Sequence, residues 1–509
     1  MRQVLRSARS VLAERRARAD GDTGYLIYVS VLVAGLVAVP TALAIVRGLA
    51  QPTVVTAFSS PGSARIVGMI AAALAAGALL LGRTRGPVVP SPFLTEFLAG
   101  SDLPRHVTVL RPFLVSGAVL ACSVGAAVGL VVAARVVGGA AASVSAVLVV
   151  LGCLGFSGLL SVLWLMGQSL PRRITVGLAL AVVAMGAATN GDTLGFTPWG
   201  WVALLWQGMS TGAPTVWWPA IALAVSSLAL IGVPALLCNL RADEMMAQSR
   251  RWQSISALVH TGDVAGASGT LRDPPTRGRR RRIPLTGPLM LAIVQRDVIA
   301  AGRFPVRITL GSLAVVGAGW LTAVTAAMPD GADWITALAG VSLAYLGVGV
   351  WCDGLRNAAD NATPGSLYGR SALTLLGAHS VIPLLIAVVF GSLGAIGGAV
   401  GGAVGGAVVW WMLLAVFIVL VRVLDCAKGP MPIGLLLPVP TPVGDVSILN
   451  AMAWQADALL IVLVVAGGLT VHVGAAGSGG AGLGSALWLF VAAALVAALA
   501  LRRIRALGR

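Results

Sequence analysis

The residues able to carry chemistry in this chain are few and widely separated. The four histidines show no ligand spacing, and they are His106, His260, His379 and His472. The five cysteines form no CxxC pair, and they are Cys122, Cys153, Cys238, Cys352 and Cys426. A metal site or a disulfide framework has a recognisable spacing of such residues. We therefore expect free thiols, no bound metal and no catalytic residue.

Nucleotide hydrolysis is excluded by the distribution of lysine. A Walker A loop holds phosphate with a glycine-rich turn that ends in Gly-Lys-Ser or Gly-Lys-Thr. The only lysine of the chain, Lys428, lies in the sequence Ala-Lys-Gly. A lipid-linked glycosyltransferase would need acidic residues in an early outer loop, and residues 51–64 contain none. We expect no enzymatic activity, and no cofactor bound by this chain.

The composition indicates a membrane protein instead. Of the 509 residues 58% are hydrophobic and 10% are charged, whereas a soluble domain carries about 25% charged residues. The mean hydropathy is +0.93. The net charge of +17 could suit nucleic acid, but the arginines lie in short connectors, as the positive-inside rule expects. We therefore predict an integral membrane protein that binds no nucleic acid.

The apolar runs predict twelve spans, since a helix needs about 20 residues to cross a bilayer. In the first half they cover residues 25–47, 66–82, 113–135, 141–167, 174–190 and 217–239. In the second half they cover residues 305–328, 334–352, 380–400, 405–424, 456–473 and 484–501. Twelve such helices predict an all-α protein. Alternate connectors hold most of the arginines, which predicts that these connectors and both termini lie in the cytoplasm.

The two halves of the chain correspond in order. Each opens with an amphipathic stretch, at residues 4–18 and 289–303, followed by two spans. A polar loop that contains proline comes next, at residues 83–111 and 353–379, and four more spans follow. Six spans in each half predict a parallel pseudo-repeat about an axis along the membrane normal.

The longest polar run, residues 241–303, separates these halves. It includes the arginine cluster at 277–282. We expect residues 1–240 and 283–509 to form two six-span units, each with its own amphipathic helix. Residues 241–282 would then be a basic cytoplasmic linker.

Two apolar stretches contain features that favour helix packing. Residues 380–424 are too long for one crossing, so we expect a turn near Gly401. The glycines of this stretch are spaced for close helix approach, as in Gly394 and Gly398. The tryptophan-rich connector 191–216 predicts an aromatic belt or a short helix at the outer interface.

A secondary active transporter with a 6+6 helical fold is the alternative reading. Such carriers usually rely on ionisable or unwound polar sites inside the membrane. The predicted spans contain no aspartate or glutamate near their centres. Residues 82–91 also lack the short basic signature that major facilitator carriers have between spans two and three. Both observations count against this alternative.

The polar loops contain several short motifs. The first loop contains residues 86–90 (Gly-Pro-Val-Val-Pro) and 93–98 (Phe-Leu-Thr-Glu-Phe-Leu). The second contains residues 354–360 (Gly-Leu-Arg-Asn-Ala-Ala-Asp) and 367–370, and residues 438–445 read Pro-Val-Pro-Thr-Pro-Val-Gly-Asp. These segments resemble permease subunits of ABC-2-type exporters, especially large actinobacterial membrane permeases. The resemblance covers the layout of the whole chain, which departs from the usual pattern by fusing two six-span units.

This resemblance implies an exporter subunit of the cytoplasmic membrane that works with separate ATP-binding cassette subunits. ATP and magnesium would bind in those partners, and no second permease would be required. A coupling helix in each polar loop would dock on the ATPase. The docking residues implied are Glu96, Arg105 and Arg111 in the first loop, and Arg356, Asp360 and Arg370 in the second. The alternative for each is an ordinary solvated charge of an inner loop.

Overall fold

The computed structural model describes most of the chain beyond its N-terminal stretch. It covers residues 35, 38–59, 61–99, 104–139, 144–188, 191–211, 217–260, 264–270, 287–325, 333–362, 369–399, 404–429, 431–435, 440–441, 444–445, 447–475 and 481–507. The amphipathic stretch predicted at 4–18, most of the first predicted span and the arginine cluster at 277–282 lie outside these ranges.

The contacts of the chain divide it into two compact units. Unit 1 contains Met1–Val88 and Leu103–Leu240, and unit 2 contains Val89–Asp102 and Arg241–Arg509. The division at Leu240 coincides with the predicted start of the linker. The segment Val89–Asp102 belongs by its contacts to unit 2, although the prediction included it in the first six-span unit.

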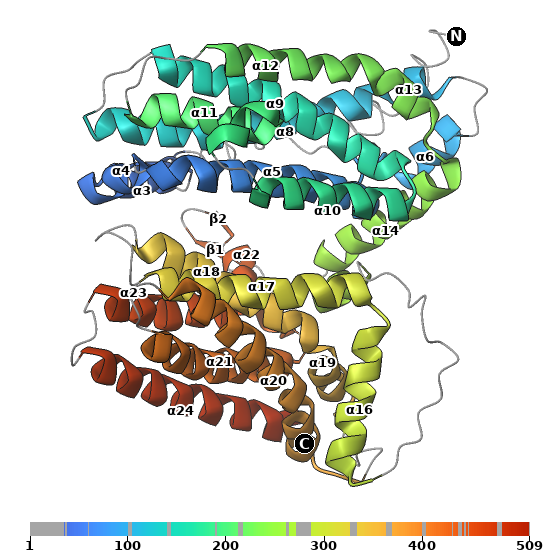
Figure 1. The fold of residues 1–509 in the computed structure, drawn as a ribbon. Coiled ribbons are helices and arrows are strands. Elements are labelled where there is room, and N and C mark those ends of the chain that lie inside the picture. The colour runs from blue at the N-terminus through green and yellow to red at the C-terminus, as the bar shows by residue number, and fades with distance from the viewer. Residues whose placement is uncertain are drawn as a thin grey trace. The chain divides into compact units, whose positions relative to one another are not determined.

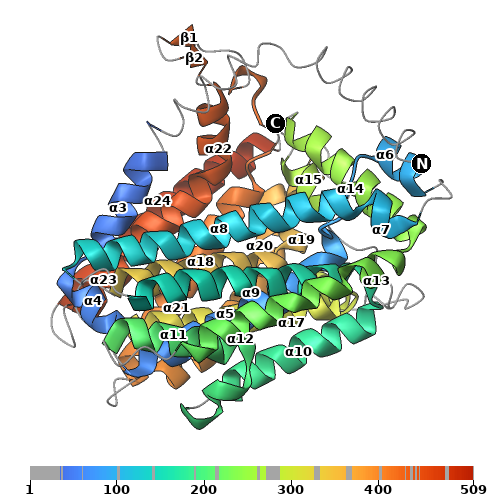
Figure 2. The same ribbon diagram turned by 90° about the horizontal axis from the view of Figure 1, so that it is seen from above.

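Unit 1 is a bundle of apolar helices around α9 (Figures 1 and 2). Its elements are α3 (Val39–Leu49), α4 (Pro52–Phe58), α5 (Pro61–Thr84), α7 (Arg105–Thr108), α8 (Leu110–Val137), α9 (Val144–Ser169), α10 (Arg172–Ala188), η2 (Gly191–Phe196), α11 (Pro198–Thr211), α12 (Trp218–Ser226), η3 (Ser227–Gly232) and α13 (Val233–Cys238). Helix α9 contacts α5, α8, α11 and α12. It is apolar on all sides and buries Phe156, Leu160 and Leu165, as expected of a central helix.

Unit 2 is centred on α21. Its elements are α6 (Pro92–Ala99), α14 (Ala242–His260), α15 (Val264–Thr270), α16 (Leu289–Gly302), α17 (Pro305–Val324), α18 (Asp333–Trp351), α19 (Asp353–Asp360), α20 (Ala372–Gly398), α21 (Val404–Cys426), η5 (Ile433–Leu435), β1 (Pro440–Thr441), β2 (Gly444–Asp445), α22 (Ser447–Ile461), the π-helical η6 (Val462–Gly467), α23 (Gly468–Ala475) and α24 (Ala481–Leu507). The side chains of Trp411, Phe417 and Ile418 on α21 are fully buried. The two short strands pair antiparallel, with Pro440 opposite Asp445.

Ten helices in the described ranges are long and apolar enough to cross a membrane. They are α5, α8, α9, the continuous helix Trp218–Cys238, α17, α18, α20, α21, the continuous helix Met452–Gly474, and α24. This finding confirms an all-α, multi-pass membrane protein. The predicted span 174–190 corresponds to α10, which has 17 residues and is slightly shorter than these ten.

The predicted division of residues 380–424 into two helices is confirmed, because α20 ends at Gly398 and α21 begins at Val404. Gly401, where the turn was predicted, lies outside the described residues. The start of α20 differs from the prediction by two turns. The helix begins at Ala372, where the Ser371 side chain caps it by accepting a hydrogen bond from the backbone N–H of Thr374. Residues 372–379 (Ala-Leu-Thr-Leu-Leu-Gly-Ala-His) are mostly apolar, and the prediction was wrong to assign them to the polar loop that ends at His379.

The predicted linker contains a helix of 19 residues that composition alone did not reveal. This helix, α14, carries Asp243 and Glu244 in its first turn. Acidic side chains at this end stabilise a helix because they interact with the positive end of its dipole. It buries Met245 and Ile255 and packs against α6. The Ser249 hydroxyl donates a hydrogen bond to the carbonyl oxygen of Pro90. The first part of the linker is therefore an ordered support for the α6 segment.

The tryptophan-rich connector forms the short helix α11, as predicted. Helix α11 packs against α5 and α9, and Trp199 is buried. The indole N–H of Trp206 donates to the Ser63 hydroxyl at 3.0 Å. The Trp201 indole N–H donates to the carbonyl oxygen of Gly195 at 2.7 Å. These contacts anchor the helix to unit 1.

The glycine spacing of α20 yields a stability prediction. A Cβ on Gly394 would lie 1.9 Å from the carbonyl oxygen of Val316 on α17, whereas a Cβ on Gly397 meets nothing within 4 Å. We expect Gly394→Ala to lower the free energy of unfolding by about 1–3 kcal/mol, the usual cost of overpacking. Gly397→Ala should leave it unchanged or raise it slightly, because alanine favours helix. Thermal unfolding in detergent tests this, and equal midpoints for the two variants would contradict the close contact of α17 with α20.

Candidate functional site

Both predicted coupling loops contain a helix of eight residues. Helix α6 lies in the first loop and α19 in the second. Glu96 is exposed on α6, and Asp360 is exposed at the end of α19. The two helices therefore present one acidic side chain each to solvent.

The structure brings together only two of the six predicted docking residues. Arg356 and Asp360 line the same cavity beside α19. Arg370 is exposed just before α20. In the first loop Glu96 belongs to unit 2, whereas Arg105 at the start of α7 and Arg111 near the start of α8 belong to unit 1.

The amphipathic pattern of α19 positions its polar residues. Leu355 and Ala359 are buried on one side of the helix, whereas Asn357 and Asp360 are exposed on the other. Cys352, directly before the helix, is also buried, and this burial raises the pKa of its thiol above the ordinary value. The buried side packs against α20 and α21. The opposite side, with Asp353 and Arg356, borders the cavity.

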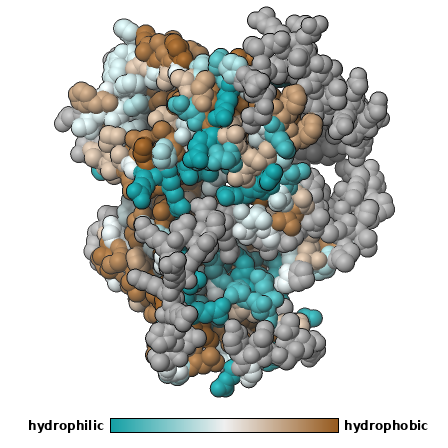
Figure 3. Space-filling model, turned by 90° about the vertical axis from the view of Figure 1, so that its right-hand side faces the viewer, coloured by the Kyte–Doolittle hydropathy of each residue, from teal (hydrophilic) through white to brown (hydrophobic). Residues whose placement is uncertain are grey.

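This cavity, which we call the α16–α19 cleft, has a volume of about 370 Å³. It is lined by Arg296, Asp297, Ala300, Ala301, Phe304, Arg307, Ile308, Val350, Trp351, Asp353, Gly354, Arg356, Asn357, Asp360 and Ile382. These residues come from or adjoin α16, α17, α18, α19 and α20. In the lower half of Figure 3, which looks onto the end of unit 2 where α16 and α19 lie, hydrophilic residues gather between hydrophobic ones.

Two ion pairs connect the walls of the α16–α19 cleft. Arg307 on α17 binds Asp353 on α19 with both terminal nitrogens, at 2.5 Å and 3.0 Å. Nδ1 of His379 on α20 lies 2.6 Å from Oδ2 of Asp297 on α16, with side chains 5% and 10% exposed. Gly354 abuts this second pair so closely that a Cβ would lie 2.6 Å from both partners. Helix α19 is thus connected to α17 by a bidentate bond and packs directly on the pair that joins α16 to α20.

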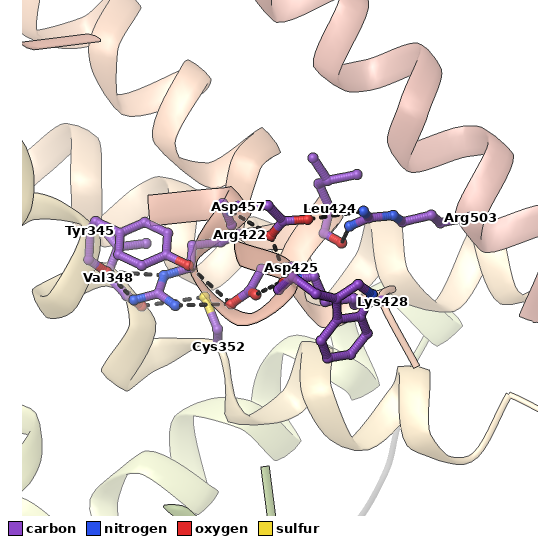
Figure 4. A network of polar contacts seen from close by, with 11 residues as sticks. Tyr345, Val348, Cys352, Arg422, Leu424, Asp425, Lys428, Asp457 and Arg503 are labelled. Carbon is purple, nitrogen blue, oxygen red and sulfur yellow. Dashed lines mark hydrogen bonds and ion pairs between the residues drawn. The ribbon is translucent and has the colours of Figure 1, made fainter. Parts of the chain in front are cut away.

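A second polar cluster lies near the ends of α18, α21 and α24 and in the second half of α22 (Figure 4). The Arg422 side chain on α21 is 8% exposed and pairs with Asp425 at 3.3 Å. Its Nε and Nη2 donate to the carbonyl oxygen of Tyr345, the former at 3.0 Å. The guanidinium lies 3.4 Å from the centre of the Tyr345 ring, whose hydroxyl donates to Asp425 at 3.1 Å. This arrangement satisfies a buried cation by a carboxylate, a carbonyl and an aromatic face.

Lys428 and Asp457 extend this cluster to α22 and α24. The Lys428 ammonium is 6% exposed and donates to Asp457 and to the carbonyl oxygen of Trp454. Nη2 of Arg503 donates to the other carboxylate oxygen of Asp457 at 3.1 Å. Asp457 therefore bridges Lys428, which follows α21, and Arg503 on α24.

The sequence did not reveal either set of ion pairs. Asp297 and His379 are 82 residues apart, and Arg307 and Asp353 are 46 apart, so no local spacing marks them. Arg422 and Asp425 are the exception, because their i,i+3 spacing on a predicted helix is visible in the sequence and indicates a contact. Among the residues that the structure describes, no group of three or more His, Cys, Asp or Glu could hold a metal ion.

The paired groups of the cleft connect four helices, α16, α17, α19 and α20. Within the described ranges no thiol or hydroxyl is hydrogen-bonded to His379. Comparison with family models, curated proteins and solved structures finds no match to this chain.

Proposed function

We propose that this chain is the membrane-spanning permease subunit of an ATP-driven exporter of the ABC-2 type. The observation that carries the proposal is the pair of eight-residue helices, α6 and α19, each after the predicted second span of its half. Each exposes an acidic residue, Glu96 or Asp360, to a docking partner. Separate ATP-binding cassette subunits would bind these helices.

The proposed topology has twelve spans with both termini in the cytoplasm. The ten candidate spans, α10 and the predicted span 25–47 make up this number. The two six-span units would be related as a parallel repeat in the cytoplasmic membrane. Under this topology α6, α14, α19 and the α16–α19 cleft are all on the cytoplasmic side.

The contacts of α19 suggest how hydrolysis in a partner would move the spans. A displacement of α19 acts on α17 through the Arg307–Asp353 pair. It also acts on α16 and α20, because Gly354 packs against Asp297 and His379. Helix α6 is held by α14, so docking there acts on the linker helix. In this mechanism ATP turnover would open a path for an amphipathic or lipid-like substrate, which fits the scarcity of charge in the spans.

Capture of the partner tests the proposal. We expect the purified chain to capture an ATP-binding cassette subunit encoded beside it, and the Glu96→Lys/Asp360→Lys variant to lose at least tenfold in affinity. The reason is that reversal puts a like charge at both proposed contacts. Glu244→Lys is the control, because Glu244 lies on α14 outside the two docking helices.

Retention of full affinity by the Glu96→Lys/Asp360→Lys variant would contradict docking at α6 and α19. Solute flux driven by an ion gradient in ATP-free proteoliposomes would instead establish the secondary transporter.

A further inference from the structure

The α16–α19 cleft contains two arginines whose charges are not paired. Arg307 is bound to Asp353, and Asp297 is bound to His379. Arg296 and Arg356 also line the cleft, and neither makes a hydrogen bond or an ion pair with any residue that the structure describes. Two guanidinium groups are therefore open to an anion. Of the three carboxylates that line the cleft, Asp360 is the one without an ion-pair partner among the described residues.

An aromatic side chain also lines the cleft. Trp351, at the end of α18, borders the cavity beside the two arginines. Its indole nitrogen is itself buried and has no hydrogen-bond partner within the described ranges. The proposal for the cleft therefore depends on its two arginines and its apolar wall.

The remaining wall of the cleft is apolar and belongs to the membrane helices. Phe304 directly precedes α17, Ile308 and Val350 lie on α17 and α18, and Ile382 lies on α20. The cleft therefore borders both the polar end of unit 2 and the start of the apolar spans. A ligand that fits it has an anionic head and an apolar body.

We propose that the α16–α19 cleft binds the phosphate of an anionic phospholipid of the cytoplasmic leaflet. Arg296 and Arg356 hold the phosphate oxygens, since guanidinium groups bind phosphate by paired, charge-assisted hydrogen bonds. Phe304 and Ile382 contact the upper part of the acyl chains. Basic pockets between membrane helices on the cytoplasmic side are known to hold such headgroups. The volume of about 370 Å³ lies within the range of pockets for small organic ligands. This site requires no ATPase and goes beyond the proposed transport function, although its assignment to the cytoplasmic leaflet rests on the proposed topology.

The test measures binding of phosphatidylglycerol to the full chain in uncharged detergent, by native mass spectrometry and by the shift in unfolding temperature. We expect saturable binding by the wild-type chain and at least a tenfold weaker affinity for Arg296→Gln/Arg356→Gln. The matched control is Arg502→Gln/Arg505→Gln, which removes the same charge from two exposed residues of α24 and should bind as the wild type does. The variant Arg296→Lys/Arg356→Lys keeps the charge and should retain part of the affinity.

Three outcomes would overturn the proposal. They are equal binding by the Arg296→Gln/Arg356→Gln and wild-type chains, equal binding of phosphatidylcholine and phosphatidylglycerol, or displacement of the lipid by millimolar inorganic phosphate. The last result would assign the cleft to a free anion. Because the two arginines make no ion pair in the described structure, the double variant should unfold within 2 °C of the wild type without added lipid. If the unfolding temperature shows that the double variant is misfolded, the single variants Arg296→Gln and Arg356→Gln are measured instead, and equal binding by these and the wild-type chain would overturn the proposal.

Discussion

Asp457→Asn is expected to lower the free energy of unfolding by about 3 kcal/mol, because it leaves the buried Lys428 ammonium without its nearest carboxylate; the Asp457 side chain itself is 28% exposed. Asp457 accepts hydrogen bonds from both Lys428 and Arg503. The Lys428 side chain is only 6% exposed, so its ammonium would remain in a water-poor site without its nearest carboxylate. Asp425, at 3.9 Å from the same ammonium, compensates for part of the loss, which keeps the estimate at the lower end of the range.

A thiol-reactive maleimide dye measures this effect during heating. Cys153, Cys352 and Cys426 are buried in the folded chain, whereas Cys122 and Cys238 are exposed and give the baseline. Burial raises the pKa of the Cys352 thiol, so this thiol stays protonated and unreactive until the protein unfolds.

Asp360→Asn is the matched control for Asp457→Asn. It removes an exposed carboxylate that has no ion pair within the described structure, and should change the free energy of unfolding by less than about 0.5 kcal/mol. Equal melting temperatures of the two variants would show that the cluster in Figure 4 does not stabilise unit 2.

The membrane helices could be predicted from the sequence because the bilayer imposes their length. A span must satisfy its backbone internally and present apolar side chains over about 20 residues, and both requirements are visible in a hydropathy pattern. The predicted spans 217–239 and 405–424 differ by at most two residues at each end from the helices Trp218–Cys238 and α21 (Val404–Cys426). The eight-residue helices in the two polar loops also fall where the layout of the halves placed them.

The amphipathic and polar parts could not be predicted in the same way. Helix α14 is formed by charged and apolar residues together, and its support is the tertiary contact with α6. The α16–α19 cleft depends on Arg307 meeting Asp353 and on Asp297 meeting His379, pairs that only the packing of α16 to α20 brings together. Of the six predicted docking residues, Arg356 and Asp360 share a site because they lie one helical turn apart. Arg105 and Arg111 belong to unit 1. Glu96 and Arg370 belong to unit 2 but do not line the cleft.

The second large expected effect is on ATP hydrolysis by the partner that docks on α6 and α19. In the proposed mechanism these helices receive the movement of the ATP-binding subunit, so the membrane chain should alter the rate at which that subunit hydrolyses ATP. We expect at least a threefold increase in the hydrolysis rate when the wild-type chain is added to its partner in lipid nanodiscs. Glu96→Lys/Asp360→Lys should abolish the increase, because the partner no longer docks. Glu244→Lys should preserve it.

The rate of ATP hydrolysis by the partner, with and without this chain, is therefore the most direct test of the proposed function. The proposal predicts stimulation by the wild-type chain and by Glu244→Lys, and none by Glu96→Lys/Asp360→Lys. An unchanged hydrolysis rate in the presence of folded wild-type chain would contradict it, as would equal stimulation by the wild-type and Glu96→Lys/Asp360→Lys chains.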